Sequence, residues 1–475
     1  MKLRWMQPTI GLASTLLLAG CATVPREAGF PDVQKLVSER GVDRVHWNQG
    51  TPEDQAVAAA VDRLLKRELS AEEAVQVALL NNRSLQATYA DLMVAQADVV
   101  QAGLLKNPVF EGEFKIHEAD GDLAFEGSIV QDFVDIFQIP LRKRIAEGQF
   151  EAAKLRVAEA VLAVAWETRS AFYRLQADQQ LLELRKTVLD ASEASYAVAQ
   201  GLRRAGNVTE LALLQERVQF EQAKVDYAAA EAMVLADREP LSALMGVWGS
   251  AGEWRIAPRL SDPSATTPLA IDALERNAVL NSLALAAYRQ QYVTAGGRLQ
   301  LIRPFAWLPE GEAGVAAEHD SADGWALGPA VALPIPLFDQ GQARTATALA
   351  ELNRTRDLYA AKAIEIRAAA RAAAVRLRAA QERVAYYRQV ILPVRQRVLD
   401  QTQLQYNAMQ VGVFQLLQAR QDQVRAGGEY IEAMRDYWLS RARADAIAAG
   451  HVPESSAQAD SPTVSAAQGG GGGGH

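Results

Sequence analysis

Two stretches of the chain alternate apolar and polar residues with a period of two. This period is typical of strands that have one apolar and one wet face. The stretches cover residues 109–139 and 305–335, and an Asp- and Gly-containing turn divides each into segments of about ten residues. The sequence therefore predicts two β-hairpins. Their apolar positions are Phe110, Gly112, Phe114, Ile116, Phe125, Gly127, Ile129 and Phe133, and then Phe305, Trp307, Ala313, Val315, Trp325, Leu327 and Val331.

The rest of the chain has helical character. Ser70 and Glu73 form a capping-box pattern, which predicts a helix from there to about Gly103. Residues 149–200 and 342–392 contain neither Gly nor Pro. Fifty helical residues would span roughly 75 Å, and helices of that length usually pack as coiled coils.

Each long helix is expected to turn and run back. Gly201 is the first expected break, and a turn at Gly206-Asn207 precedes a return helix from Thr209 to Arg238. In the second case the turn is expected near Gly412, with a return helix that ends at about Ala449. The predicted fold is mainly α, with long coiled-coil helical hairpins and four strands per protomer.

These features recur as two tandem structural repeats. Pro108 and Pro140 are 32 residues apart, as are Pro304 and Pro336, and the two pairs are offset by 196. Helical motifs on either side match at offsets of 195 and 203. We expect a first repeat at residues 68–250 and a second at 251–450. Because proline fixes φ and lacks a donor, the four prolines are expected to be strand–helix hinges.

No stretch after residue 25 is long and apolar enough for a transmembrane helix, so any crossing must use strands. Four strands cannot close a barrel, and lipid does not tolerate an open sheet edge. Two chains would supply eight strands and three would supply twelve, and the pattern alone does not choose between them. The alternative is a soluble hairpin that packs on the helices.

The N-terminus has the layout of a secretory signal, with Lys2 and Arg4 before an apolar run at residues 10–19. The only cysteine, Cys21, follows Leu18-Ala19-Gly20 and resembles the lipid acceptor of a bacterial lipoprotein, which would carry palmitate. We expect a signal peptide at 1–20 and a lipidated extension at 21–67. Ala22 implies sorting to the outer membrane. The tail at 451–475 is expected to be disordered because it is of low complexity and ends in a glycine run.

Candidate chemistry is sparse. A net charge of −8 argues against a nucleic-acid partner. The sequence contains no HExxH, P-loop, GxSxG or CxxC motif, and its five histidines have no ligand spacing. We therefore expect no enzyme activity, no cofactor and no metal site.

Taken together, the chain resembles the TolC-like outer-membrane efflux channels over about four fifths of its length. The motifs that carry the resemblance are Asn81-Asn82-x-x-Leu85, Gln101-Ala102-Gly103-x-x-x-Asn107-Pro108, Leu333-Pro334-Ile335-Pro336-Leu337-Phe338-Asp339-x-Gly341, and the two helix-turn runs 206–215 and 411–419.

The resemblance implies a homotrimer with a shared 12-stranded β-barrel on a periplasmic α-barrel. It also implies a periplasmic adaptor and an inner-membrane pump of the proton-driven kind as partners. The protein would then lie in the outer membrane of a Gram-negative bacterium, lipid-anchored, as the passive export duct of a tripartite pump.

The resemblance also implies roles for residues at the helix turns. Tyr406, Gln415 and Gln418 match a pore constriction whose family members often carry carboxylates at the two glutamine positions, so this constriction would be uncharged. The expected adaptor contacts are Gly206, Asn207, Thr209 and Gly412.

Two questions stay open at this point. The cargo is expected to be heavy-metal ions or small toxic molecules, because residues 139–146 are similar to channels of metal-resistance systems. The alternative function is a periplasmic coiled-coil lipoprotein that acts as a scaffold and does not span the membrane.

Overall fold

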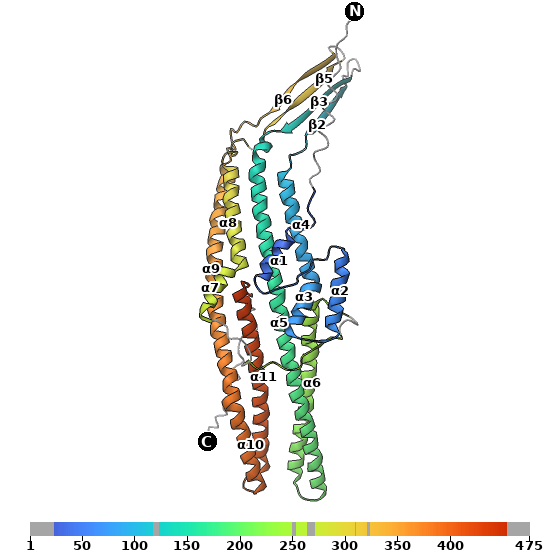
Figure 1. The fold of residues 1–475 in the computed structure, drawn as a ribbon, viewed down its shortest axis with the longest axis vertical. Helices are drawn as coiled ribbons and strands as arrows, with labels where there is room; N and C mark the ends of the chain where they lie inside the picture. The colour runs from blue at the N-terminus through green and yellow to red at the C-terminus, as the bar shows by residue number, and fades with distance from the viewer. Residues whose placement is uncertain are drawn as a thin grey trace, which may run out of the picture.

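The computed structural model describes residues 23–116, 123–248, 253–263, 271–308, 310–320 and 324–453. The signal segment, Cys21 and most of the expected disordered tail lie outside these residues. The described chain is an elongated array of helices with a small sheet at one end and two helix–helix turns at the other (Figure 1). The predicted mainly helical architecture is confirmed.

The elements follow one another in a recurring order. The first half contains α1 Phe30–Ser38, α2 Pro52–Leu65, β1 Glu68–Leu69, α3 Ala71–Asn81, α4 Arg83–Gly103, β2 Val109–Ile116, β3 Leu123–Asp132, α5 Val134–Arg204 and α6 Glu210–Met245. The second half contains β4 Arg255–Ile256, α7 Ile271–Asn281, α8 Leu283–Ile302, β5 Glu312–Asp320, β6 Gly324–Ala332, α9 Gln342–Tyr386, the π-helical turn η4 Tyr387–Ile391, α10 Leu392–Asn407 and α11 Val413–Ala449.

The expected helix from Ser70 to Gly103 is two helices. The capping box is present, since Ser70 Oγ accepts from Glu73 N at 3.2 Å and Ser70 N donates to Glu73 Oε2 at 3.0 Å. The helix then stops at Asn82, whose ψ of 118° is extended. The Asn82 side chain begins α4 by accepting from Leu85 N at 2.8 Å, and it donates to Leu244 O at 2.8 Å. A residue that caps the next helix therefore divides the two.

The long helices extend beyond their expected ends. Helix α5 has 71 residues and passes through Gly201, so the expected break there is wrong. An isolated glycine weakens a helix by only about 1 kcal/mol, which a helix of this length can tolerate. The real turn has Gly206 in the left-handed region at φ 79°, and Thr209 caps α6 through a bond from Ala212 N at 3.2 Å. The return helix α6 continues past Arg238 to Met245.

The hairpins are shorter than predicted. Strand β3 ends at Asp132, whose Oδ1 accepts from Val134 N at 3.1 Å and from Asp135 N at 3.2 Å. This carboxylate starts α5, so Pro140 lies inside the helix and is not a strand–helix hinge. In the second half β5 begins at Glu312, so the expected strand positions Phe305 and Trp307 lie in the connection after α8.

The other three predicted hinge prolines do lie in connections. Pro108 immediately precedes β2, Pro304 follows α8, and Pro336 lies between β6 and α9.

The strands form one antiparallel sheet in the order β2-β3-β5-β6 within the described residues. Strands β2 and β6 are the two edges. The smaller parallel pair β1-β4 joins the two halves near the middle of the molecule. None of the described helices combines the length and apolarity needed to cross a membrane.

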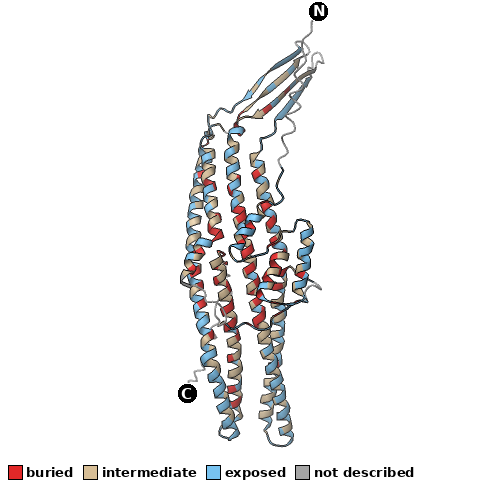
Figure 2. Cartoon of the chain, viewed as in Figure 1, coloured by how far each residue is buried: buried red, intermediate tan, exposed pale blue. Residues whose placement is uncertain are grey.

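Buried side chains concentrate in the middle of the helical array and thin out toward the helix turns (Figure 2). The largest cluster joins α5, α7, α9 and α11 and is rich in alanine, which lets helices approach closely. Helices α6, α9 and α10 each carry apolar side chains that are exposed in the single chain.

Candidate functional site at the sheet and the helix turns

One face of the sheet is apolar. The register aligns Phe110 with Ile129, Ile129 with Val315, and Ala317 with Leu327. These positions lie on the same face because side chains alternate along each strand. Most of the large apolar side chains on it are exposed, namely Phe110, Phe114, Ile129, Val315, Trp325, Leu327 and Val331.

The opposite face of the sheet carries polar side chains and small side chains. It carries Glu111, Glu113, Glu126 and Glu318, with Lys115 the basic residue among its described positions. Lys115 Nζ contacts Glu126 at 2.9 Å and Glu113 at 3.7 Å. Glycine and alanine occupy most of the same face on β5 and β6. The predicted pattern of one apolar and one wet face is therefore confirmed, and the wet face is acidic.

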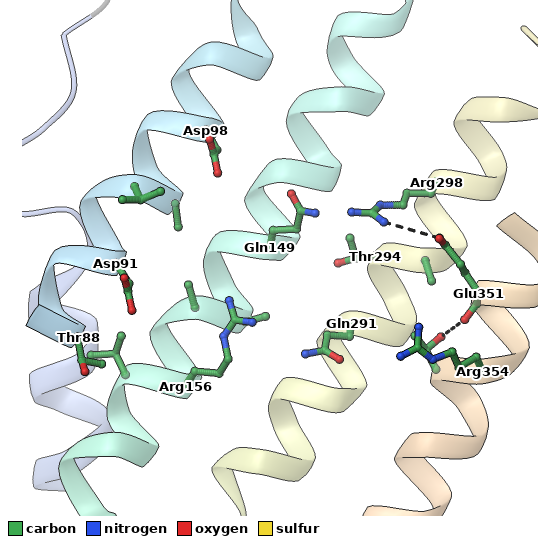
Figure 3. Close-up of a pocket in the computed structure, with 17 residues that line it drawn as sticks. Thr88, Asp91, Asp98, Gln149, Arg156, Gln291, Thr294, Arg298, Glu351 and Arg354 are labelled. Atoms are coloured by element: carbon green, nitrogen blue, oxygen red, sulfur yellow. Dashed lines mark hydrogen bonds and ion pairs between the residues drawn. The ribbon is translucent and has the colours of Figure 1, made fainter. Parts of the chain in front are cut away.

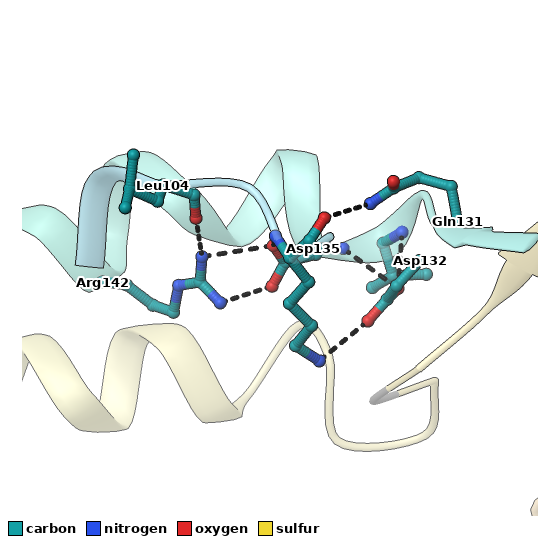
Figure 4. Close-up of polar contacts among 7 residues, drawn as sticks. Leu104, Gln131, Asp132, Asp135 and Arg142 are labelled. Carbon is teal, nitrogen blue, oxygen red and sulfur yellow. Dashed lines mark hydrogen bonds and ion pairs between the residues drawn. The ribbon is translucent and has the colours of Figure 1, made fainter. Parts of the chain in front are cut away.

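Charged groups, not prolines, build the junction between β3 and α5 (Figure 4). Arg142 contacts the buried carboxylate of Asp135 and donates to Leu104 O at 3.2 Å. Lys106 Nζ pairs with Asp132 Oδ2 at 3.0 Å, and Gln131 donates to Lys106 O at 2.8 Å. These contacts tie the end of α4, the end of β3 and the start of α5 together. The sequence analysis did not predict this network. Acidic residues followed by basic residues at the start of a helix could have indicated it.

The predicted constriction and adaptor residues all lie at the end of the molecule opposite the sheet (Figure 1). Gly206, Asn207 and Thr209 form the α5–α6 turn, and Gly412 caps the start of α11. Tyr406 is in the last turn of α10, and its hydroxyl has no hydrogen-bond partner among the described residues. The structure thus places the predicted constriction residues and the predicted adaptor contacts at the same end of the molecule, and no side-chain hydrogen bond joins the two groups within the described part of the chain.

The constriction glutamines lead to a charged cluster that sequence reasoning did not find. Gln418 Nε2 donates to Asp422 Oδ1 at 3.0 Å. Asp422 Oδ2 in turn accepts from Arg395 of α10 at 3.1 Å, and Arg425 lies 3.6 Å from Oδ1. The charge of Asp422 is therefore neutralised across the hairpin, and Gln415 and Gln418 present amides beyond it.

The two hairpins meet along a polar seam. Gln421 Nε2 of α11 donates to Gln219 Oε1 of α6 at 2.7 Å, and within the first hairpin Ser195 Oγ of α5 donates to Glu216 of α6 at 2.7 Å. Above them is a cavity of about 830 Å³, bounded by α5, α6, α9, η4 and α11. Beside the cavity α5 packs directly against α11, where Leu184 and Leu181 lie close to Gly427 and Gly428.

The second hairpin contains an irregular turn that the first lacks. At η4 the bond from Leu392 N–H reaches Tyr387 O, one residue beyond the α-helical pattern, and Pro393 follows in the first turn of α10. The Tyr387 hydroxyl donates to Glu429 at 3.1 Å. Burial and the nearby Glu429 carboxylate raise the pKa of Tyr387, so it stays a donor.

A second cavity, of about 650 Å³, lies between α4, α5, α8 and α9 (Figure 3). Its wall carries both charge signs, with Arg156, Arg298 and Arg354 facing Asp91, Asp98 and Glu351. Arg298 pairs with Glu351 at 3.7 Å. In the ranges that the structure describes, no group of three or more His, Cys, Asp or Glu side chains could hold a metal ion.

The fold and these surfaces define a class of protein: an elongated helical array that carries a two-faced sheet. Residues 74–247 match the family described as outer membrane efflux protein. The predicted resemblance to the TolC-like outer-membrane efflux channels is confirmed.

Individual relatives are distant. The chain is 21% identical to the cobalt-zinc-cadmium resistance protein CzcC of Cupriavidus metallidurans over 80% of this chain and 90% of that protein. It is 25% identical to the probable efflux pump outer membrane protein TtgC of Pseudomonas putida, over 50% of this chain and 52% of that protein. The crystal structure of CusC matches the fold with a TM-score of 0.67 and 14% identity, over 81% of this chain and 93% of that one.

Proposed function

We propose that three copies of this chain form the outer-membrane channel of a tripartite efflux pump. The observation that carries the proposal is the sheet, which has one exposed apolar face, one acidic face and two open edges. Such a sheet is stable in lipid only if its edges pair with other chains. Three chains would give a closed 12-stranded barrel with the glutamates toward water.

Two exposed helix seams support a ring of chains. On α6 the positions 211, 214, 218, 225, 228, 232 and 235 follow a heptad pattern and are exposed Leu, Val or Ala. On α9, Ile364, Val375 and Tyr386 recur every eleven residues and are exposed. Because α6 and α9 are on opposite sides of the array, the seam of one chain can cover that of the next (Figure 1).

The ring would place the polar constriction at the helix turns, with Tyr406, Gln415 and Gln418 as its lining and Gly206, Asn207, Thr209 and Gly412 as adaptor contacts. Since the glutamines carry no charge, the carboxylates of the sheet would form the charge filter instead. An adaptor opens the duct only if it binds the open arrangement better. The periplasmic adaptor and the inner-membrane pump are proposed partners.

We further propose that Cys21 carries the lipid anchor and that the cargo includes divalent transition-metal ions. The name of CzcC, which this chain matches over 90% of that protein, supports the metal cargo, while the match to TtgC keeps other toxic solutes in view. Growth of a strain that lacks its own channel, in graded zinc, cobalt or toluene, separates the two cargo classes.

Single-channel recording in a planar bilayer tests the duct. The purified protein is expected to give discrete conductance steps, and its mass in detergent is expected to equal three chains. A Cys21→Ala variant should still assemble in the outer-membrane fraction, because the barrel and not the anchor spans the membrane. A soluble Cys21→Ala protein that never conducts would refute the proposal.

A further inference from the structure

Directly below the sheet, α5 exposes a face that changes from apolar to basic. Ile136, Phe137, Pro140, Lys143 and Arg144 are all exposed. At 100° per residue they fall within about one third of the helix circumference, and Phe137 and Arg144 are roughly 10 Å apart along the axis. The headgroup region on each side of a bilayer is roughly 5–8 Å thick, so this rise is enough to reach from acyl chains to headgroups.

Neighbouring connections repeat the apolar part. The segment after β6 exposes Leu333, Ile335, Leu337 and Phe338, the last at 92%. Leu105 is exposed before β2. A band of uncovered apolar side chains therefore continues the apolar face of the sheet toward the helices.

The basic part of this face has no ion-pair partner within the described ranges. Among the residues that the structure describes, no carboxylate pairs with Lys143 or Arg144. By contrast Arg142, one residue from Lys143, is held by Asp135. Two unpaired cations next to an exposed apolar band suit a ligand that is apolar at one end and anionic at the other.

The face is on the outside of the array. Lys154 lies five helical turns below Ile136 on the same side of α5 and pairs with Asp32 of α1 at 2.6 Å. Helix α1 thus covers this side, and the cavity of Figure 3 opens on the opposite side of α5. The cations consequently point away from the space that a ring of chains would enclose.

We propose that Ile136, Phe137, Pro140, Lys143 and Arg144 form a binding surface for anionic phospholipid of the periplasmic leaflet. The apolar residues contact the acyl chains and the cations contact the headgroup phosphate. This inference rests on the proposed function, because the sheet must lie in the membrane for the surface to meet lipid.

The test uses the full chain reconstituted in nanodiscs of equal phosphatidylglycerol and phosphatidylcholine, with retained lipids counted by native mass spectrometry. Lys143→Gln/Arg144→Gln is expected to lower the ratio of phosphatidylglycerol to phosphatidylcholine roughly tenfold. Lys143→Arg/Arg144→Lys, which keeps both charges, should keep the ratio. Lys186→Gln/Arg367→Gln removes the same charge from exposed helix positions far from the sheet and should also keep it.

An unchanged ratio in the first variant, or an equal fall in the Lys186/Arg367 variant, would overturn the lipid surface. So would dissociation of the assembly in place of lipid loss, because the face would then belong to a neighbouring chain. Planar-bilayer recording of the same proteins separates the two proposals. Wild-type protein that conducts while the ratio is unchanged sinks only the lipid surface, whereas wild-type protein that never inserts sinks the channel itself.

Discussion

The two halves of the chain share their joints and differ in their long helices. In the first half Asn81 Nδ2 donates to Gly246 O at 2.9 Å, and in the second Asn281 Nδ2 donates to Ala448 O at 2.8 Å. Each bond holds the break between two short helices against the end of a return helix. Above the turns, however, α5 is one continuous helix, while η4 separates α9 from α10 and Pro393 lies in the first turn of α10.

This difference indicates where one helical hairpin can move relative to the other. A π-helical turn leaves the regular hydrogen-bond pattern, and a proline removes one further bond, so both weaken a helix locally. The joints are rigid and common to both halves, and the irregular turn belongs to the second hairpin alone within the described residues. We expect the α10–α11 end to swing about η4 while the α5–α6 hairpin stays fixed.

The largest expected effect comes from breaking the shared joint. In Gly450→Ala the added Cβ would clash directly with Asn281 O at a φ of 102°, so a loss of about 4 kcal/mol is expected. Gly246→Ala meets Asn81 O at 2.5 Å with φ 66° and should cost about 3 kcal/mol. Thermal unfolding at a fixed scan rate measures both.

Gly201→Ala is the matched control for the joints. Nothing lies within 4 Å of its Cβ and the residue is inside α5, so a gain of about 0.5–1 kcal/mol is expected. Equal losses in all three variants would show that the joints have no special role.

The irregular turn at η4 is the second feature in which the two halves are expected to differ. Pro393→Ala restores a backbone donor beside η4, which should stiffen α10 and lower the open probability by about tenfold, if roughly 1.4 kcal/mol is regained. Single-channel recordings give this quantity directly. Pro240→Ala makes the same change in α6 of the first hairpin and is expected to leave gating unaltered, so an equal effect there would place the hinge elsewhere.

A structural feature can be predicted from the sequence when neighbouring residues determine it, and it cannot when residues far away along the chain determine it. The strand faces and the capping box at Ser70 depend on neighbouring residues, and both are as predicted. Pro140 is not a hinge, because Asp132 begins the helix earlier through its own hydrogen bonds. The break at Asn82 combines a local cap on Leu85 N with a bond to the end of α6, 162 residues away, and the local pattern does not reveal the second contact.

The candidate site divides in the same way. Turn residues such as Gly206 and Gly412 are predictable from local propensity, and they lie at turns. The Arg395–Asp422 pair that surrounds Gln418 joins two helices across a turn, and identifying it needs the register of the hairpin. The role of the glutamines in a pore depends on neighbouring chains and stays a prediction.

Adding charge at the helix turns is expected to have a smaller effect, on ion permeability. The same change can be made in both hairpins, so their roles can be compared directly. Gln415→Glu/Gln418→Glu would place two carboxylates per chain at the proposed constriction and should raise the cation-to-anion permeability ratio several-fold. The reversal potential in a salt gradient measures it. Ala212→Glu/Gln215→Glu makes the equivalent change on α6 at the repeat offset of 203, and an equal shift would mean that both hairpins line the pore.

The smallest effect concerns acid–base behaviour above the turns. In the first hairpin the carboxyl groups of Asp178 on α5 and Asp237 on α6 share a hydrogen bond, and burial followed by this partner raises the pKa of Asp178 to about 7. In the second, Arg383 instead pairs with Asp436 at 3.2 Å. Because the folded chain holds the Asp178 proton more tightly than the unfolded chain does, its contribution to stability is complete below about pH 4 and is lost as the pH rises through 7.

Asp178→Asn removes this titration but keeps the hydrogen bond. The unfolding temperature of the wild-type protein should therefore fall between about pH 5 and pH 8, and that of the variant should fall less, so that the two differ by a few degrees at about pH 8. Asp190→Asn, at an exposed α5 carboxylate that pairs with Lys186, should keep the wild-type slope. If the slopes of all three proteins coincide, the first hairpin has no proton-sensitive contact, and any difference in how the two hairpins move must then come from the irregular turn at η4.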